Sequence, residues 1–150
     1  MKIISLFLLI FLFPAILLSQ EIKLFTTDGC SVFPDGTSTN QSLWINCCIR
    51  HDFAYWKGGT FEERLTADKT LENCVIDLGQ PEIAKLMLVG VRAGGSPYFP
   101  APYRWGYGWP FLRGYKALSM EEISDIERKL TLSIETLISL KNEMKKQSKE

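Results

Sequence analysis

The chain lacks the residues that histidine-rich metal sites and nucleic-acid binding require. It contains one histidine, His51. Sites that need two or three histidine ligands from one chain are therefore excluded, and any imidazole chemistry must use His51. The 17 basic and 17 acidic residues balance, whereas nucleic-acid binding usually needs a basic excess. The 150 residues show no internal repeat and suffice for one domain with a real core.

The long uncharged run of the sequence stands at its N-terminus, from Ile3 to Leu18 behind Lys2. This pattern is typical of a secretory signal peptide, which we predict over residues 1–19. A retained membrane anchor is the alternative, but the run is short for a span of about 20 residues. We therefore expect one domain over residues 20–150. We also expect a secreted or cell-envelope protein, periplasmic if the source is bacterial.

Cysteines are few, at positions 30, 47, 48 and 74. An even number in an exported chain indicates two disulfides. A zinc site formed with His51 is disfavoured, because adjacent cysteines do not match the usual C-x2-4-C ligand spacing. Neighbouring Cys47 and Cys48 cannot easily bridge each other, so two pairings remain open.

The remaining pattern predicts a mainly α fold. Helices are expected at residues 43–57, 60–77, 81–92 and 118–147. Thr60 with Glu63, and Ser119 with Glu122, form capping-box patterns at two of the helix starts. Gly58-Gly59 separates the first two helices with a short turn, which favours antiparallel packing.

The long C-terminal helix is amphipathic. Ile123, Leu130, Leu137 and Met144 recur every seven residues. Such a stripe is typical of core packing or of a helix–helix seam, and an oligomer could form through it.

Residues 94–115 combine aromatic side chains with glycine and proline and show no helical or strand period. Two interpretations are open for this segment. It could place Trp and Tyr at a membrane interface, with Arg92, Arg104 and Arg113 meeting lipid phosphates. Alternatively, it forms a packed loop that covers the core.

The candidate catalytic residues lie in the segment Cys47-Cys48-Ile49-Arg50-His51-Asp52-Phe53-Ala54-Tyr55. On a helix, residues four apart share a face, so Cys47, His51 and Tyr55 form one stripe. If Cys47 bridged to Cys74 between antiparallel helices, Asp68 would lie about 9 Å from Cys74 along its helix. His51 would lie about 6 Å from Cys47 on the same arithmetic, so Asp68 and His51 could meet. A carboxylate beside one imidazole nitrogen leaves the other nitrogen free as a base.

The pattern CCxxHDxxY, followed by an aspartate six residues before a cysteine, resembles the secreted phospholipase A2 superfamily. The resemblance covers roughly residues 28 to 75, about a third of the chain. It implies a core of two antiparallel disulfide-linked helices, to which this chain adds a long C-terminal helix. It also implies the pairings Cys30–Cys48 and Cys47–Cys74.

The resemblance further implies calcium-dependent hydrolysis of the sn-2 ester of phospholipids, with a membrane surface as substrate and no nucleic-acid partner. His51 would activate water, Asp68 would orient His51, and Tyr55 would support Asp68. Asp52 would ligate Ca²⁺. The carbonyls of Gly29, Ser31 and Phe33 would complete the calcium site, because oxygen ligands suit this hard cation.

The sequence departs from the family pattern at several positions. Ser31 and Phe33 stand where glycines are expected, and Ala54 replaces a common cysteine. Two other functions are therefore considered. One is a non-catalytic phospholipase A2-like module of the cell envelope that binds lipid or protein. The other is a structural envelope protein that associates through its C-terminal helix.

Overall fold

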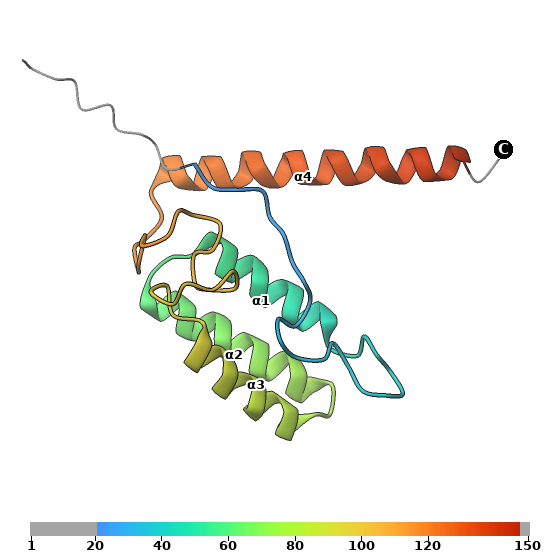
Figure 1. The fold of residues 1–150 in the computed structure, drawn as a ribbon, viewed down its shortest axis with the longest axis vertical. Helices are drawn as coiled ribbons and strands as arrows, with labels where there is room; N and C mark the ends of the chain where they lie inside the picture. The colour runs from blue at the N-terminus through green and yellow to red at the C-terminus, as the bar shows by residue number, and fades with distance from the viewer. Residues whose placement is uncertain (1–20, 148–150) are drawn as a thin grey trace, which may run out of the picture.

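The computed structural model describes residues 21–147, which are mainly α-helical, as predicted. The predicted signal peptide lies outside these described residues. The helices are α1 (Ile45–Lys57), α2 (Phe61–Asp77), α3 (Pro81–Gly94) and α4 (Met120–Gln147), and no strand occurs among residues 21–147 (Figure 1). Within the same range, no helix combines the length and hydropathy that a membrane span requires.

Local side-chain contacts set the starts of two helices. Thr60 accepts a hydrogen bond from the Glu63 backbone, and the Glu63 carboxylate accepts one from the Thr60 backbone. Ser119 and Glu122 form the same reciprocal pair before α4. Both capping boxes are confirmed, and each satisfies two backbone donors that a helix start leaves free.

Helices α1 and α2 run antiparallel, and α3 returns antiparallel to α2 (Figure 1). The reversal between α1 and α2 uses Gly58 and Gly59 at φ 67° and 139°. Both values lie in a region that glycine adopts without steric cost. The main core cluster between the helices includes Trp44, Leu71 and Val75, each at most 3 % exposed.

The aromatic segment packs against the helices through its tryptophans. Trp105 and Trp109 are each 1 % exposed, and their indole N–H groups donate to the carbonyls of Gly59 and Lys57 at 2.9 and 2.6 Å. Trp56 of α1 donates to Lys23 O at 3.0 Å. The packed-loop interpretation is thus confirmed for the two segment tryptophans, whereas Tyr98 and Phe99 of the same segment are exposed.

The arginines of this region bind protein groups rather than face outward. Arg104 is buried and donates to the carbonyls of Trp105, Gly106 and Trp109. Arg113 donates to Glu122 at 2.9 Å. The interpretation that these two side chains meet lipid phosphates is therefore wrong.

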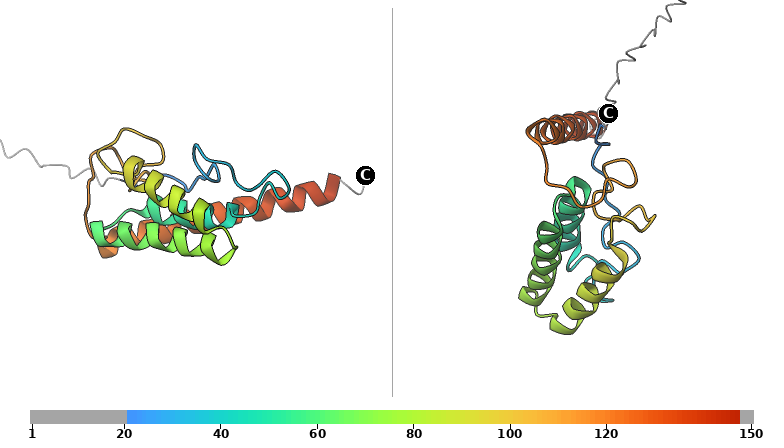
Figure 2. Two further views of the ribbon diagram at one scale, coloured as in Figure 1. Left: turned by 90° about the horizontal axis from the view of Figure 1, so that it is seen from below. Right: turned by 90° about the vertical axis from the view of Figure 1, so that its left-hand side faces the viewer.

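Helix α4 touches the body of the protein mainly through its first turns. Ile126 is 6 % exposed and joins a cluster with Ile22, Trp56 and Trp109. Past Leu130 the apolar side chains are exposed, and the helix projects beyond α1–α3 (Figure 2). Of the two alternatives for the stripe, core packing therefore holds only for its first part, because α4 leaves the bundle after about three turns. Oligomer formation through α4 stays a prediction.

Removing residues 132–150 tests this arrangement. Because the side chains of residues 132–145 are largely exposed, we expect the free energy of unfolding to change by less than about 1 kcal/mol. Denaturant unfolding of the full and shortened chains gives this difference. A loss above about 2 kcal/mol would show that this part of α4 packs on the folded body.

Candidate functional site

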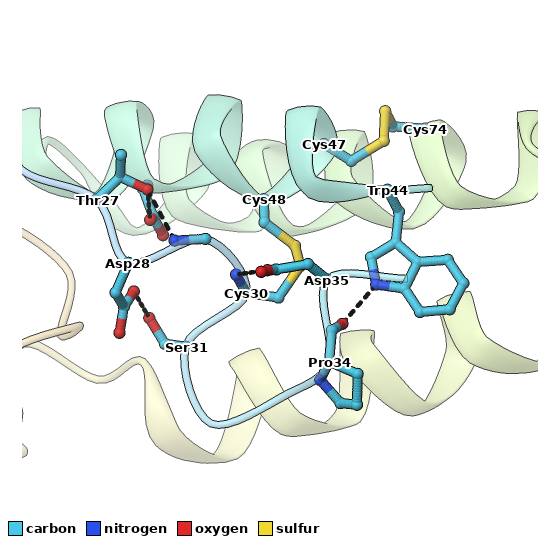
Figure 3. Close-up of a disulfide and its surroundings, with 12 residues drawn as sticks. Thr27, Asp28, Cys30, Ser31, Pro34, Asp35, Trp44, Cys47, Cys48 and Cys74 are labelled. Carbon is cyan, nitrogen blue, oxygen red and sulfur yellow. Dashed lines mark hydrogen bonds between the residues drawn. A yellow bond between two sulfur atoms is a disulfide. The ribbon is translucent and has the colours of Figure 1, made fainter. Parts of the chain in front are cut away.

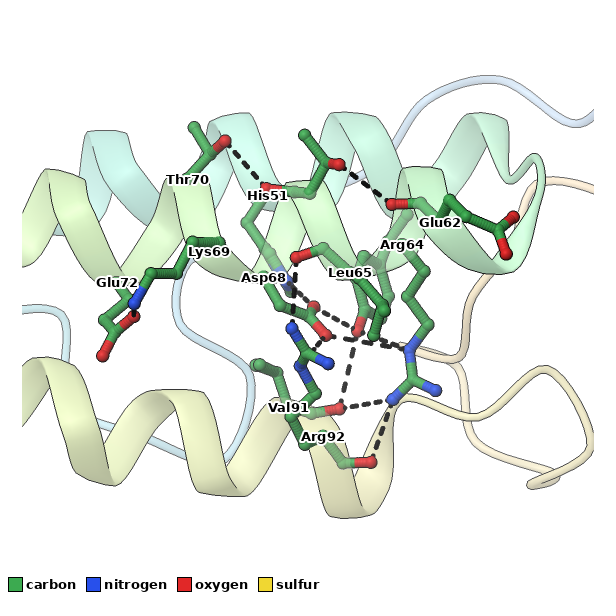
Figure 4. A network of polar contacts seen from close by, with 12 residues as sticks. His51, Glu62, Arg64, Leu65, Asp68, Lys69, Thr70, Glu72, Val91 and Arg92 are labelled. Atoms are coloured by element: carbon green, nitrogen blue, oxygen red, sulfur yellow. Dashed lines mark hydrogen bonds and ion pairs between the residues drawn. The ribbon is translucent and has the colours of Figure 1, made fainter.

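His51, Asp68 and Tyr55 meet in the interior, where the sequence predicted them to meet. His51 Nε2 lies 3.0 Å from Asp68 Oδ1, and the Tyr55 hydroxyl donates to the same oxygen at 2.7 Å. His51 and Tyr55 stand one turn apart on α1. Asp68 comes from α2 and points toward His51 (Figure 4). Asp68 is fully buried and His51 is 8 % exposed. This contact fixes Nε2 toward Asp68 and leaves Nδ1 as the second imidazole nitrogen.

Two arginines that the sequence analysis did not assign to the site surround the other oxygen of Asp68. Arg92 Nε of α3 lies 2.8 Å from Asp68 Oδ2, and Arg64 Nε lies 3.9 Å from it. Arg64 also donates to the carbonyls of Val91 and Arg92. Its spacing of four residues before Asp68 was a usable signal, whereas Arg92 joins from another helix and leaves no such pattern.

Burial explains why Asp68 needs these partners. A carboxylate removed from water is stable as an anion only when it is paired and hydrogen-bonded. One oxygen of Asp68 contacts His51 and Tyr55, and the other faces two guanidinium groups. Asp68 is therefore fixed in position by contacts from three helices. Burial, reinforced by the charge of Asp68, also raises the pKa of the Tyr55 hydroxyl, which stays a donor.

Asp52 lies beside His51 on α1 and is 8 % exposed. Thr27 donates to its Oδ2 at 2.6 Å, a contact that sequence reasoning missed because Thr27 lies 25 residues away in a loop. Burial raises the pKa of the Asp52 carboxyl to about 6, and the Thr27 bond opposes this shift. Within residues 21–147, the one hydrogen bond to the Asp52 carboxylate is that of Thr27 to Oδ2, and no lysine or arginine forms an ion pair with it.

The loop before α1 is fixed by one disulfide to the helix and by two hydrogen bonds within the loop (Figure 3). The disulfide Cys30–Cys48 ties it to α1, and the Cys30 backbone donates to Asp35 Oδ1 at 2.7 Å. Ser31 donates to Asp28 at 2.6 Å. The second disulfide, Cys47–Cys74, joins α1 to α2. Both pairings implied by the resemblance are confirmed.

The carbonyls expected to bind calcium belong to Gly29, Ser31 and Phe33. In the described part of the chain, no donor hydrogen-bonds any of these three oxygens, whereas Cys30 O accepts from Phe33 N at 2.7 Å. Val32 adopts φ 59° with 90 % of its surface exposed. That conformation is strained for a β-branched residue and marks the loop as locally constrained.

A cavity of about 350 Å³ opens beside these groups. Its polar wall includes His51 and Asp52 together with the loop from Gly29 to Phe33, and its apolar wall comes from Leu71 of α2 and from α3. All of the predicted catalytic and calcium-binding residues except buried Asp68 line this cavity. Asp68 does not line it but contacts His51, which does.

The described residues hold no group of three or more histidine, cysteine, aspartate or glutamate side chains placed to bind a metal. This finding bears on side-chain clusters only, because the expected calcium ligands are mainly backbone carbonyls. Asp52 is a buried carboxylate that forms no ion pair with a lysine or arginine among the described residues. The carbonyls of Gly29, Ser31 and Phe33 accept no hydrogen bond there, and these residues line the same cavity as Asp52. This donor set fits a hard cation.

We found no family model, curated protein or solved structure that matches the chain.

Replacing Asp68 by Asn should strongly destabilise the protein. Removing one partner from a buried charge network leaves Arg64 and Arg92 uncompensated, and such changes cost about 3–5 kcal/mol. Chemical denaturation measures the loss. Asp77→Asn on the same helix is the matched control, because Asp77 is exposed and should change stability by less than about 0.5 kcal/mol. Equal effects of the two variants would contradict the network.

Replacing Asp52 by Asn should stabilise the protein at pH 8 in the presence of a chelator. The folded pKa of about 6 exceeds the ordinary value of 3.8, so ionising Asp52 costs stability as the pH rises through this window. The cost reaches at most about 3 kcal/mol above pH 6. The advantage of Asp52→Asn should disappear near pH 4. Urea unfolding at both pH values checks this, and destabilisation at both would contradict it.

Proposed function

We propose that this protein hydrolyses the sn-2 ester of phospholipids in a calcium-dependent reaction, on a core like that of the phospholipases A2. The observation that carries the proposal is the His51–Asp68 contact at the edge of an apolar cavity. An imidazole oriented by a buried carboxylate is a suitable general base. An apolar cavity beside it suits the acyl part of a lipid ester.

In the proposed reaction, His51 Nδ1 removes a proton from a water molecule, and the resulting hydroxide attacks the ester carbonyl. The proton then passes to the leaving alcohol, so the products are a fatty acid and a lysophospholipid. Asp68 stabilises the imidazolium that forms transiently, and Tyr55 fixes the position of Asp68. No covalent intermediate with the protein is required.

The residues that would hold calcium are Asp52 and the carbonyls of Gly29, Ser31 and Phe33. Bound calcium would supply positive charge that stabilises the oxyanion of the ester. Asp52 fits this role because it is buried and no lysine or arginine among the described residues forms an ion pair with it. Val32, with φ 59°, lies between two of these carbonyls, in a loop that the Cys30–Cys48 disulfide ties to α1.

The rival function is a phospholipase A2-like module that binds lipid or protein without turnover. A blocked cleft or a broken His51–Asp68 contact would favour that rival. The contact of 3.0 Å and the open cavity of about 350 Å³ instead favour the enzyme. Two disulfides also support the proposal of a secreted or cell-envelope location, because disulfides persist in oxidising compartments.

The test is fatty-acid release from mixed phospholipid vesicles by the oxidised protein, with calcium and then with chelator. We expect release that requires calcium and that falls by at least about a hundredfold in His51→Gln, the loss typical of a missing general base. Arg50→Gln is the matched control, because Arg50 precedes His51 on α1 and is exposed.

Release that survives His51→Gln would assign the activity to another group or to a contaminant. No release from any vesicle composition, by folded and oxidised protein, would support the non-catalytic module.

A further inference from the structure

Gly90 is the glycine that neither backbone geometry nor packing explains. Of the eleven glycines, it alone combines an ordinary φ with fully open space at the position of a β-carbon; at Gly94, the β-carbon would make an ordinary contact with Tyr103 at 3.7 Å. A β-carbon at Gly90 would have no atom within 4 Å, apart from its chain neighbours and its own helix backbone. Glycine inside a helix costs about 1 kcal/mol relative to alanine. The position therefore carries a cost that the fold itself does not require.

The location of Gly90 provides a reason for this cost. Gly90 stands between Leu86 and Gly94 in the same row of α3, and all three line the cavity beside His51. A side chain at Gly90 would therefore project toward the cavity rather than into the protein core. Leu86 is 57 % exposed, so this row forms the open side of the cavity.

The cavity walls indicate the class of ligand. Leu71 and Met87 are at most 6 % exposed and form its deep apolar part, while His51 and Asp52 provide polar groups on another wall. A volume of about 350 Å³ is near the lower end of the range for ligand pockets, roughly 300–1,000 Å³. A small apolar space beside polar groups suits one alkyl chain that ends in a polar group.

We propose that the missing side chain of Gly90 leaves room on the open side of the cavity for the distal part of a long acyl chain, so that this position sets the chain length that binds. Gly90 is thus a specificity-determining position. The proposal rests on the proposed function in one respect: it takes the bound chain to be the acyl part of the ester that is cleaved. Binding of the chain itself requires no turnover and can be measured alone.

The experiment measures binding of saturated fatty acids, from hexanoate to palmitate, by calorimetry below their aggregation limits and with chelator present. Gly90→Phe should weaken palmitate binding at least about tenfold, which corresponds to about 1.4 kcal/mol, and should affect hexanoate less. Val89→Phe is the matched control, because exposed Val89 adjoins Gly90 but does not line the cavity. It should leave both affinities unchanged.

Gly90→Ala tests whether the backbone tolerates a side chain. It should raise thermal stability, since alanine is the better helix former, and should preserve palmitate binding because one methyl group fills little of the cavity.

Three results would overturn the proposal: palmitate binding that Gly90→Phe leaves unchanged, an equal loss in Val89→Phe, or no fatty-acid binding by the unmodified protein. Its failure is separable from failure of the proposed function. If Gly90→Phe hydrolysed vesicles with the same chain-length profile as the unmodified protein, the role of Gly90 would be contradicted and the proposed function would stand. If the expected binding pattern appeared without any hydrolysis, the proposed function would be contradicted and the role of Gly90 would stand.

Discussion

The buried charge of Asp68 is the constraint on which the rest of the structure depends. A fully buried carboxylate must be compensated, and here the compensation comes from three helices: His51 and Tyr55 of α1, Arg64 of α2 itself and Arg92 of α3. The same contacts that compensate the charge also hold α1, α2 and α3 together. Stability and the orientation of the imidazole therefore have one origin, and a change that moves Asp68 should affect both.

The two disulfides extend this arrangement to the loop. Cys47–Cys74 joins α1 to α2, and Cys30–Cys48 ties the loop of residues 28–36 to α1. Asp52 follows Cys48 by one helical turn, and it lines the same cavity as the loop residues that carry the expected calcium ligands. A loop with a strained Val32 would be less well fixed without that bridge and the Asp35 contact.

Local periodicity made the central part of this structure predictable. The spacing of His51 and Tyr55, the Gly58-Gly59 turn and the capping boxes all follow from helix geometry, and the structure has each of them. Contacts between distant loops were not predictable. Thr27 on Asp52 and the indole bonds of Trp105 and Trp109 arise from segments without a period. The heptad stripe of α4 correctly predicted an apolar helix face, but periodicity alone does not show which surface that face packs against.

The orientation of the single imidazole is the most direct test of this account. The ¹⁵N chemical shifts of His51 report which nitrogen carries the proton, and the spectrum is unambiguous because the chain has one histidine. With Nε2 facing Asp68 Oδ1 at 3.0 Å, we expect the neutral tautomer to carry its proton on Nε2, leaving Nδ1 as the base. A neutral imidazole protonated on Nδ1, or a rapidly exchanging mixture of tautomers, would contradict the central claim.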